Sequence, residues 1–138
     1  MKIQIDNSSA LIIETLGRGA ANYVYDFELR ITFCTESLTY SRDVWVDGGE
    51  LKAFIKRLNE LTECLKGDVS LVSESFDEFL FRIKSVDSLG HLALQIELGK
   101  QTLIGNEYFW SKLIESFPLD VQTLESIAEE FTNYFSED

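Results

Sequence analysis

The chain has 138 residues, a mass of 15.8 kDa, and 45% hydrophobic and 26% charged residues. This composition is typical of a globular domain and excludes a mainly disordered chain. The formal net charge of −12 argues against nucleic acid and anionic membranes as partners, because both attract basic surfaces. The sequence has neither an apolar run that could span a bilayer nor a signal peptide, so we expect a cytoplasmic protein with residues 1–138 as a single domain.

The first part of the chain predicts β-strands. Apolar residues indicate short strands at 3–5 and 11–16, and the glycines of 17–19 are typical of a turn. The clearest pattern covers residues 23–33, where apolar and polar residues alternate strictly, as they do on a strand with one buried face. Residues 38–46 predict the returning strand of a hairpin.

An amphipathic helix is predicted next. Asp47 and Glu50 have the spacing of a capping box, and Lys66 followed by Gly67 predicts the helix end. Between them, apolar residues repeat at helical spacing and form one stripe: Leu51, Phe54, Ile55, Leu58, Leu61, Thr62 and Leu65.

Strands and a second helix complete the chain. Alternation predicts strands at 68–71, 79–84 and 91–98, with a turn at 87–90, and a last strand near 108–115 whose buried face is not defined. Pro118 predicts a stop, and Asp120 is the expected N-cap of a helix. The buried stripe of that helix is Val121, Leu124, Ile127, Ala128, Phe131 and Phe135. We therefore expect an α+β fold, an antiparallel sheet of about six to eight strands with two helices packed on it, in the order strands, helix, strands, helix.

The sequence predicts no catalytic residues, no metal site and no cofactor. His91 is the only histidine, and no nucleophile motif accompanies it, so we interpret it as a surface residue beside a turn. Cys34 and Cys64 are expected to be reduced thiols, and with one histidine they fall short of a structural zinc site. No phosphate-binding glycine motif and no EF-hand spacing is present. A small-ligand-binding domain or an enzyme centred on His91 is the least favoured alternative.

Acidic residues concentrate near the C-terminus. Between residues 105 and 138, eight acidic residues face a single basic one, Lys112. The outer face of the last helix would carry Glu125, Glu129 and Glu130, either as a solubilising surface or as a docking surface for a basic protein. The predicted partner-binding residues are Glu125, Glu129 and Glu130, together with Asp77, Glu78, Tyr108 and Trp110.

The order of several short motifs resembles the WapI-type immunity-protein family, small bacterial cytoplasmic proteins linked to contact-dependent toxins. The motifs are Trp45-Val46, the leucine-rich helix, Lys66-Gly67, Val69-x-Leu71, Phe79-x-Phe81, Gly90-His91 and the 117–124 segment with Asp120, Gln122 and Thr123. The resemblance covers about residues 38–135. It implies that the protein binds and blocks the toxic domain of a secreted nuclease, and it assigns no catalytic or toxin-contacting residue.

The charge of the chain is compatible with that implied function. A nuclease needs a basic cleft for its nucleic acid, and an acidic protein can occupy such a cleft in place of phosphates. We therefore expect an interaction protein that neutralises a basic toxin. The alternative is a structural or homo-oligomeric domain, such as a homodimer, without a toxin partner.

Overall fold

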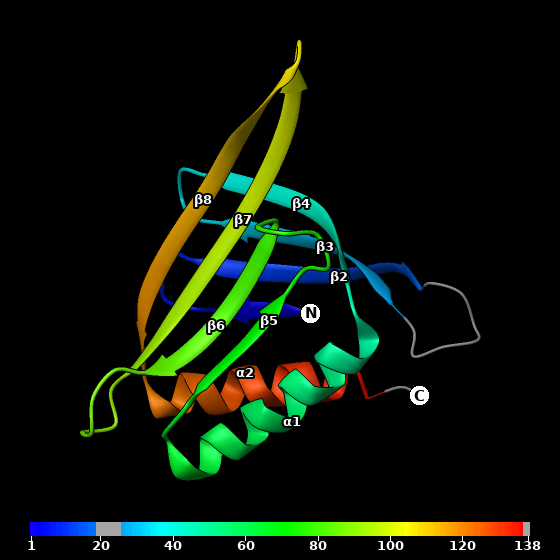
Figure 1. The fold of residues 1–138 in the computed structure, drawn as a ribbon. Helices are drawn as coiled ribbons and strands as arrows, with labels where there is room; N and C mark the ends of the chain where they lie inside the picture. Colours follow the sequence, from blue (N-terminus) through cyan, green and yellow to red (C-terminus); the bar gives the residue numbers. More distant parts are fainter. Residues whose placement is uncertain (19–25, 137–138) are drawn as a thin grey trace.

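The computed structural model describes residues 1–18 and 26–136 (Figure 1). In chain order the described elements are β1 (Lys2–Gln4), β2 (Ala10–Arg18), β3 (Phe27–Cys34), β4 (Thr39–Val46), α1 (Gly48–Cys64), β5 (Asp68–Val72), β6 (Phe79–Ser85), β7 (Leu92–Ile104), β8 (Glu107–Leu119) and α2 (Val121–Tyr134). The fold is α+β, and the predicted order of strands, helix, strands, helix is confirmed. None of the described helices combines the length and the apolar composition that a membrane span requires.

The strands form two antiparallel sheets of four strands each, so the prediction of a single sheet is wrong. The strand orders are β1-β2-β3-β4 and β5-β6-β7-β8, and the strands of the second sheet cross those of the first (Figure 1). Alternation identifies a strand and its buried face, but it does not identify the strand's partner. Here α1 separates β4 from β5 along the chain, and each meander pairs only within itself.

The two halves of the chain repeat one topology, a four-stranded meander followed by a helix. The caps repeat as well: the carboxylate of Asp47 accepts a hydrogen bond from the backbone N–H of Glu50 at 2.8 Å, and that of Asp120 accepts one from Thr123 at 2.7 Å. Both caps agree with the sequence prediction. No fixed-period sequence repeat accompanies this topology.

A shared aromatic core joins the two sheets and the two helices. Phe54 of α1, Phe81 of β6 and Phe131 of α2 form a triad with ring centroids 5.2 to 6.0 Å apart. Phe33 of β3 packs on Phe117 of β8 with a centroid separation of 6.0 Å. The three rings of the triad are fully buried, and they fix both helices against the second sheet.

Several local predictions differ from the structure. Gly17 and Arg18 belong to β2, which has a bulge between Thr15 and Gly17, and not to a turn. Residues 19 and 23–25, which the sequence placed in that turn and in the following strand, lie outside the described residues. Helix α1 ends at Cys64 with Leu65 in the left-handed conformation at φ 58°, two residues before Gly67. Val121, predicted to be buried, is exposed.

The strand before α2 also runs further than predicted. β8 continues through Pro118 to Leu119, so Pro118 does not stop it. β8 lies at the edge of its sheet, and an edge strand tolerates a residue that lacks a backbone N–H.

Candidate protein-binding site

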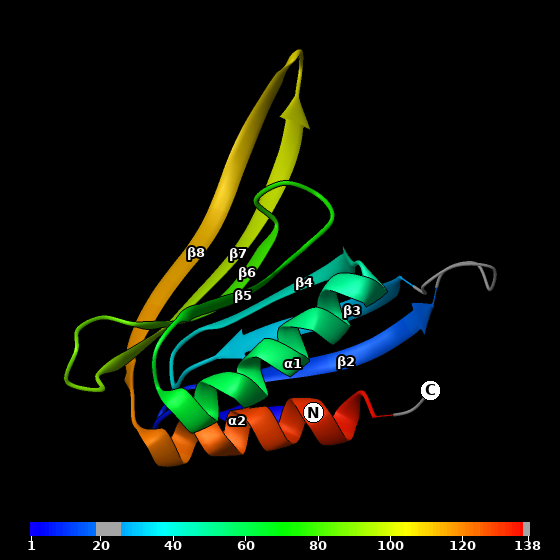
Figure 2. The ribbon, with the colours of Figure 1, turned by 60° about the horizontal axis from the view of Figure 1, so that its bottom comes forward.

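The β7–β8 hairpin extends beyond the rest of the molecule. Its two strands have 13 residues each, whereas those of the β3–β4 hairpin in the first half have eight. Every residue from 100 to 111 is exposed, and we call this segment the arm. Figure 2 shows the arm projecting away from both helices and from the first sheet. The arm therefore contributes nothing to the core.

A tight turn closes the arm. Only Gly105 and Asn106 separate β7 from β8, and Gly105 has a φ of 63°. Positive φ at the first central position is the requirement of a type II′ turn, one of the two that match the twist of a β-hairpin. The Gly-Asn pair between apolar residues was a sequence signal for this hairpin, and our prediction of a single strand near 108–115 missed it.

Large apolar side chains occupy both faces of the arm. On the face turned away from the core, Leu103 lies opposite Tyr108, and Trp110 lies opposite Gln101. On the other face, Phe109 lies opposite Thr102, next to Ile104. Tyr108 and Trp110, which the sequence selected for partner binding, are 63% and 44% exposed. The exposed apolar residues of the arm and its base are Leu103, Ile104, Tyr108, Phe109, Trp110 and Ile114.

Strand β4 crosses the second sheet at the base of the arm and holds it there. The guanidinium of Arg42 donates through Nε to the carbonyl of Gly99 at 2.9 Å and lies 3.6 Å from the carboxylate of Glu78. The hydroxyl of Tyr40 donates to the carbonyl of Ser111 at 3.2 Å. These contacts fix the point at which the arm leaves the body of the protein.

The carboxylates of Asp77 and Glu78 are engaged within the molecule. Lys112 lies 3.7 Å from Asp77 and 3.0 Å from Glu97, and its hydrogen bond to Glu97 raises the pKa of the ammonium group. Glu78 pairs with Arg42. Both acidic residues therefore stabilise the base of the arm, and their charges are compensated locally.

The three glutamates of the last helix lie at the other end of the molecule. Glu125, Glu129 and Glu130 are exposed on α2, and the first two border a shallow hollow of about 330 Å³ between α1 and α2. Trp110 is nine residues before the end of β8, a distance of roughly 30 Å along an extended strand. The structure thus places Tyr108 and Trp110 on the arm, Asp77 and Glu78 at its base, and the three glutamates on α2. Figures 1 and 2 show that the arm and α2 lie at opposite ends of the molecule.

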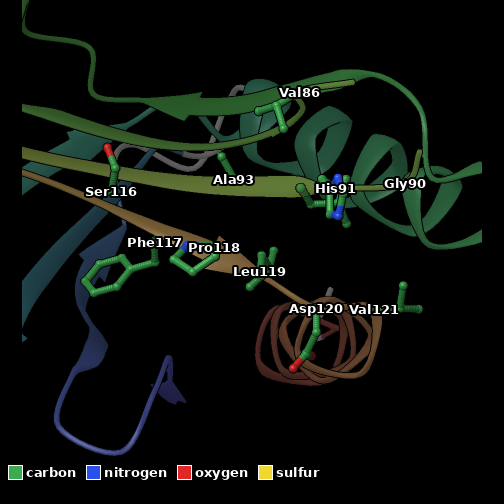
Figure 3. Close-up of a pocket in the computed structure, with 11 residues that line it drawn as sticks. Val86, Gly90, His91, Ala93, Ser116, Phe117, Pro118, Leu119, Asp120 and Val121 are labelled. Carbon is green, nitrogen blue, oxygen red and sulfur yellow. The ribbon is translucent and has the colours of Figure 1, made fainter. Parts of the chain in front are cut away.

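His91 lies at the edge of a hollow with a volume of about 860 Å³ (Figure 3). Its walls are mainly apolar, including Val86, Phe117 and Pro118. The His91 side chain is 69% exposed, and its Nδ1 lies 2.6 Å from the carboxylate of Asp87, a hydrogen bond that lowers the pKa of that carboxyl. This position agrees with the predicted surface residue beside a turn.

The polar groups around this hollow do not converge on a ligand. Asp120 caps α2, Asp87 binds His91 and two backbone N–H groups, and Ser116 supplies a hydroxyl from β8. A ligand site normally combines an apolar pocket with a few polar groups aimed at one point. The geometry therefore gives little support to catalysis or to specific small-ligand binding at His91.

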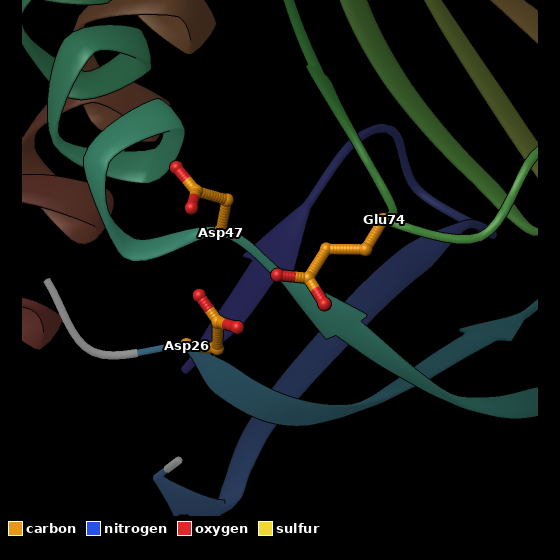
Figure 4. Close-up of side chains that lie close together, drawn as sticks. All are labelled: Asp26, Asp47 and Glu74. Atoms are coloured by element: carbon orange, nitrogen blue, oxygen red, sulfur yellow. The ribbon is translucent and has the colours of Figure 1, made fainter. Parts of the chain in front are cut away.

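Three carboxylates that are distant in sequence meet beside α1 (Figure 4). Oxygens of Asp26, Asp47 and Glu74 lie within 4.8 Å of one another. Partial burial and a hydrogen bond with Asp26, together with the negative charges of Asp26 and Asp47, raise the pKa of Glu74. Asp47 is already engaged as the cap of α1. The cluster is explained as an unfavourable contact between like charges, and sequence spacing gave no sign of it.

The two cysteines are both free, as expected. Cys34 is partly buried with its Sγ 3.7 Å from the carbonyl of Ala10, and Cys64 is exposed at the end of α1.

Comparisons with known proteins add no candidate: no family model, no curated protein and no solved structure matches this chain.

Proposed function

We propose that this chain is a protein-binding protein without catalytic activity and that the arm is a binding surface. The observation that carries the proposal is the exposure of large apolar side chains on both faces of a hairpin that the core does not need. Exposed aromatic and aliphatic side chains that cluster on one projecting element are typical of protein interfaces.

The energetics of the arm support this function. Exposed apolar residues scattered singly are ordinary, but here six lie on one hairpin. Another protein that covered these six side chains would remove their apolar surface from water, which is favourable and which the fold itself does not achieve. The anchored base, held by Arg42 and Tyr40, would present these side chains in a fixed orientation.

The test is site-specific photo-crosslinking in the producing cell. A photoreactive phenylalanine analogue replaces Tyr108 on the arm, and in a control variant it replaces Leu89, which is 78% exposed in the turn between β6 and β7. We expect the probe at Tyr108 to crosslink to a defined protein chain and the probe at Leu89 not to do so. Equal crosslinking at the two positions would contradict the proposal.

The family resemblance suggests the class of one partner, and the acidic face of α2 suggests its charge. We propose that Glu125, Glu129 and Glu130 dock a basic bacterial toxin domain. The positive potential with which a nuclease attracts phosphates would also attract these carboxylates. We further propose that the protein acts in the cytoplasm. This second surface is distinct from the arm. Its proposed role is to obstruct the active site of the toxin.

Charge reversal tests the acidic face. The triple variant Glu125→Lys, Glu129→Lys, Glu130→Lys should bind the cognate toxin at least about tenfold more weakly at low salt, mainly through slower association. The matched control reverses three exposed glutamates elsewhere, Glu36, Glu60 and Glu63. Equal losses in the two variants would assign the effect to net charge rather than to this face.

A further inference from the structure

One long edge of the second sheet has no strand partner among the described residues. β8 pairs with β7 alone, in a register that runs without a shift from Leu92 opposite Leu119 to Ile104 opposite Glu107. Natural proteins usually protect such an edge with a bulge, a proline or a short strand. β8 has 13 residues and no bulge, and its proline is at the far end, away from the arm.

The apolar area of the arm is close to what one side of a stable interface needs. Five large side chains of the arm and Ile114 at its base are each about half exposed, which amounts to roughly 100 Å² apiece and about 600 Å² together. A standard interface buries about 800 Å² on each partner. The backbone and polar side chains of the paired strands would supply the remainder.

Local charge favours a second copy of the chain over a basic partner at this place. The chain as a whole carries −12, but residues 100–114 contain Lys100 and Lys112 against Glu107 alone, and so carry +1. Two acidic molecules repel each other at most of their surfaces. The arm carries little net charge, so two copies can meet there with less repulsion than at their acidic surfaces.

We infer that the arms of two copies associate, with β8 of one pairing antiparallel to β8 of the other in a twofold homodimer. The inference rests on the proposed role of the arm as a binding surface, and it identifies the partner that the arm binds as a second copy of the chain. Pairing would join the two second sheets into one continuous sheet, a common form of recognition at strand edges.

Side-chain chemistry selects the register of the pair. With Ser111 on the twofold axis, Tyr108 faces Ile114 of the second copy, Phe109 faces Leu113, and Trp110 faces Lys112. Shifting the axis to residue 112 would place Lys112 against itself, and shifting it to residue 110 would place Phe109 against Ser111. The N–H and the carbonyl of Gly99 both bond away from β8, so the next pair of the ladder, Lys100 and Ser111, is the hydrogen-bonded one. The carbonyl of Ser111, which also accepts from Tyr40, therefore points toward β7, and Ser111 would form a non-hydrogen-bonded pair with its own copy on the axis.

Disulfide formation tests the register directly. In a Cys64→Ser background, Ser111→Cys places two thiols on the axis, where facing residues of antiparallel strands have Cα atoms about 4.5 to 5.5 Å apart, within disulfide range. The control is Ser116→Cys, an exposed position of the same strand whose two copies would be roughly 33 Å apart. We expect a covalent dimer from the first variant under mild oxidation and none from the second. Equal yields from the two variants would overturn the register.

Sedimentation over about a hundredfold range of concentration tests the dimer itself. The wild type should dissociate on dilution, Trp110→Ser should raise the dissociation constant about tenfold or more, and Glu107→Lys should lower it, because in this register Glu107 faces Glu115 of the second copy. Circular dichroism checks that each variant is folded.

A wild type that stays monomeric throughout overturns the dimer. If the probe at Tyr108 then crosslinks to a different protein, the proposed function survives; if it crosslinks to nothing, both fail.

Discussion

Gly99 at the base of the arm lets the segment between β5 and β6 approach β7 closely. A Cβ built on Gly99 would lie 2.4 Å from the backbone carbonyl oxygen of Asp77 and 3.3 Å from the ring of Trp110. Backbone cannot move aside as a flexible side chain can. Gly99→Ala should therefore lower the free energy of unfolding by about 1 to 3 kcal/mol in urea denaturation. Gly17→Ala is the control, because no atom lies within 4 Å of its added Cβ; an equal loss there would contradict the steric explanation.

The carboxylate cluster predicts a pH-dependent effect at Glu74. Its pKa is raised in the folded protein, through partial burial and then through Asp26 and Asp47, so its ionised form opposes folding at neutral pH. Glu74→Gln should raise the free energy of unfolding by about a few tenths of a kcal/mol at pH 7. Below the unfolded pKa the wild-type carboxyl is protonated in both states, so the difference should vanish as pH falls. A difference that grows toward acid pH would show that the ionised group stabilises the fold.

At the scale of elements, the caps that begin both helices make equivalent hydrogen bonds. The backbone N–H of Thr123 lowers the pKa of Asp120, so the ionised cap stabilises the fold above the unfolded pKa and loses this effect as pH falls through the folded pKa. Asp120→Ala should lower the free energy of unfolding at pH 7, measured by thermal or urea denaturation. Asp120→Asn keeps a side-chain acceptor and should retain most of that stability; a loss as large as that of alanine would exclude the capping hydrogen bond as the cause.

The arm as an element should be dispensable for folding. Replacing residues 101–110 by Asn-Gly leaves Lys100 opposite Ser111 and closes the strands with a favoured two-residue turn. Because every deleted side chain is exposed, the free energy of unfolding should change by no more than about 0.5 kcal/mol. Urea denaturation of the shortened and the full chain measures the difference in the free energy of unfolding, compared where both show a similar dependence on urea concentration. A large loss of stability would mean that the arm packs on the body of the protein.

The sequence predicted the elements better than it predicted their assembly. Alternation in β3, β6 and β7 and the stripes of α1 and α2 identified most of the core, since burial of one face leaves a periodic trace. The division into two sheets left no such trace. The separation of Trp110 from Glu125 was equally hidden, because it depends on how far β8 runs beyond the core.

At the scale of the whole molecule, salt should affect the two proposed associations in opposite directions. Each copy carries −12, so screening weakens repulsion between copies and should tighten the arm-mediated dimer. Docking of a basic toxin on the acidic face of α2 should weaken under the same change. Sedimentation and toxin binding between low and moderate salt measure both. A dimer that weakens with salt would indicate that it depends on attraction between charges rather than on apolar contact.

The surplus length of β7 and β8 also has a consequence for divergence. Selection removes many substitutions because they lower the stability of the protein below the threshold that its function needs. Residues 101–110 lie outside the packed interior, so this filter acts on them only weakly. A lineage can therefore exchange one partner for another by changing these ten positions while the folded body of the protein, from the aromatic triad to the helix caps, stays as it is.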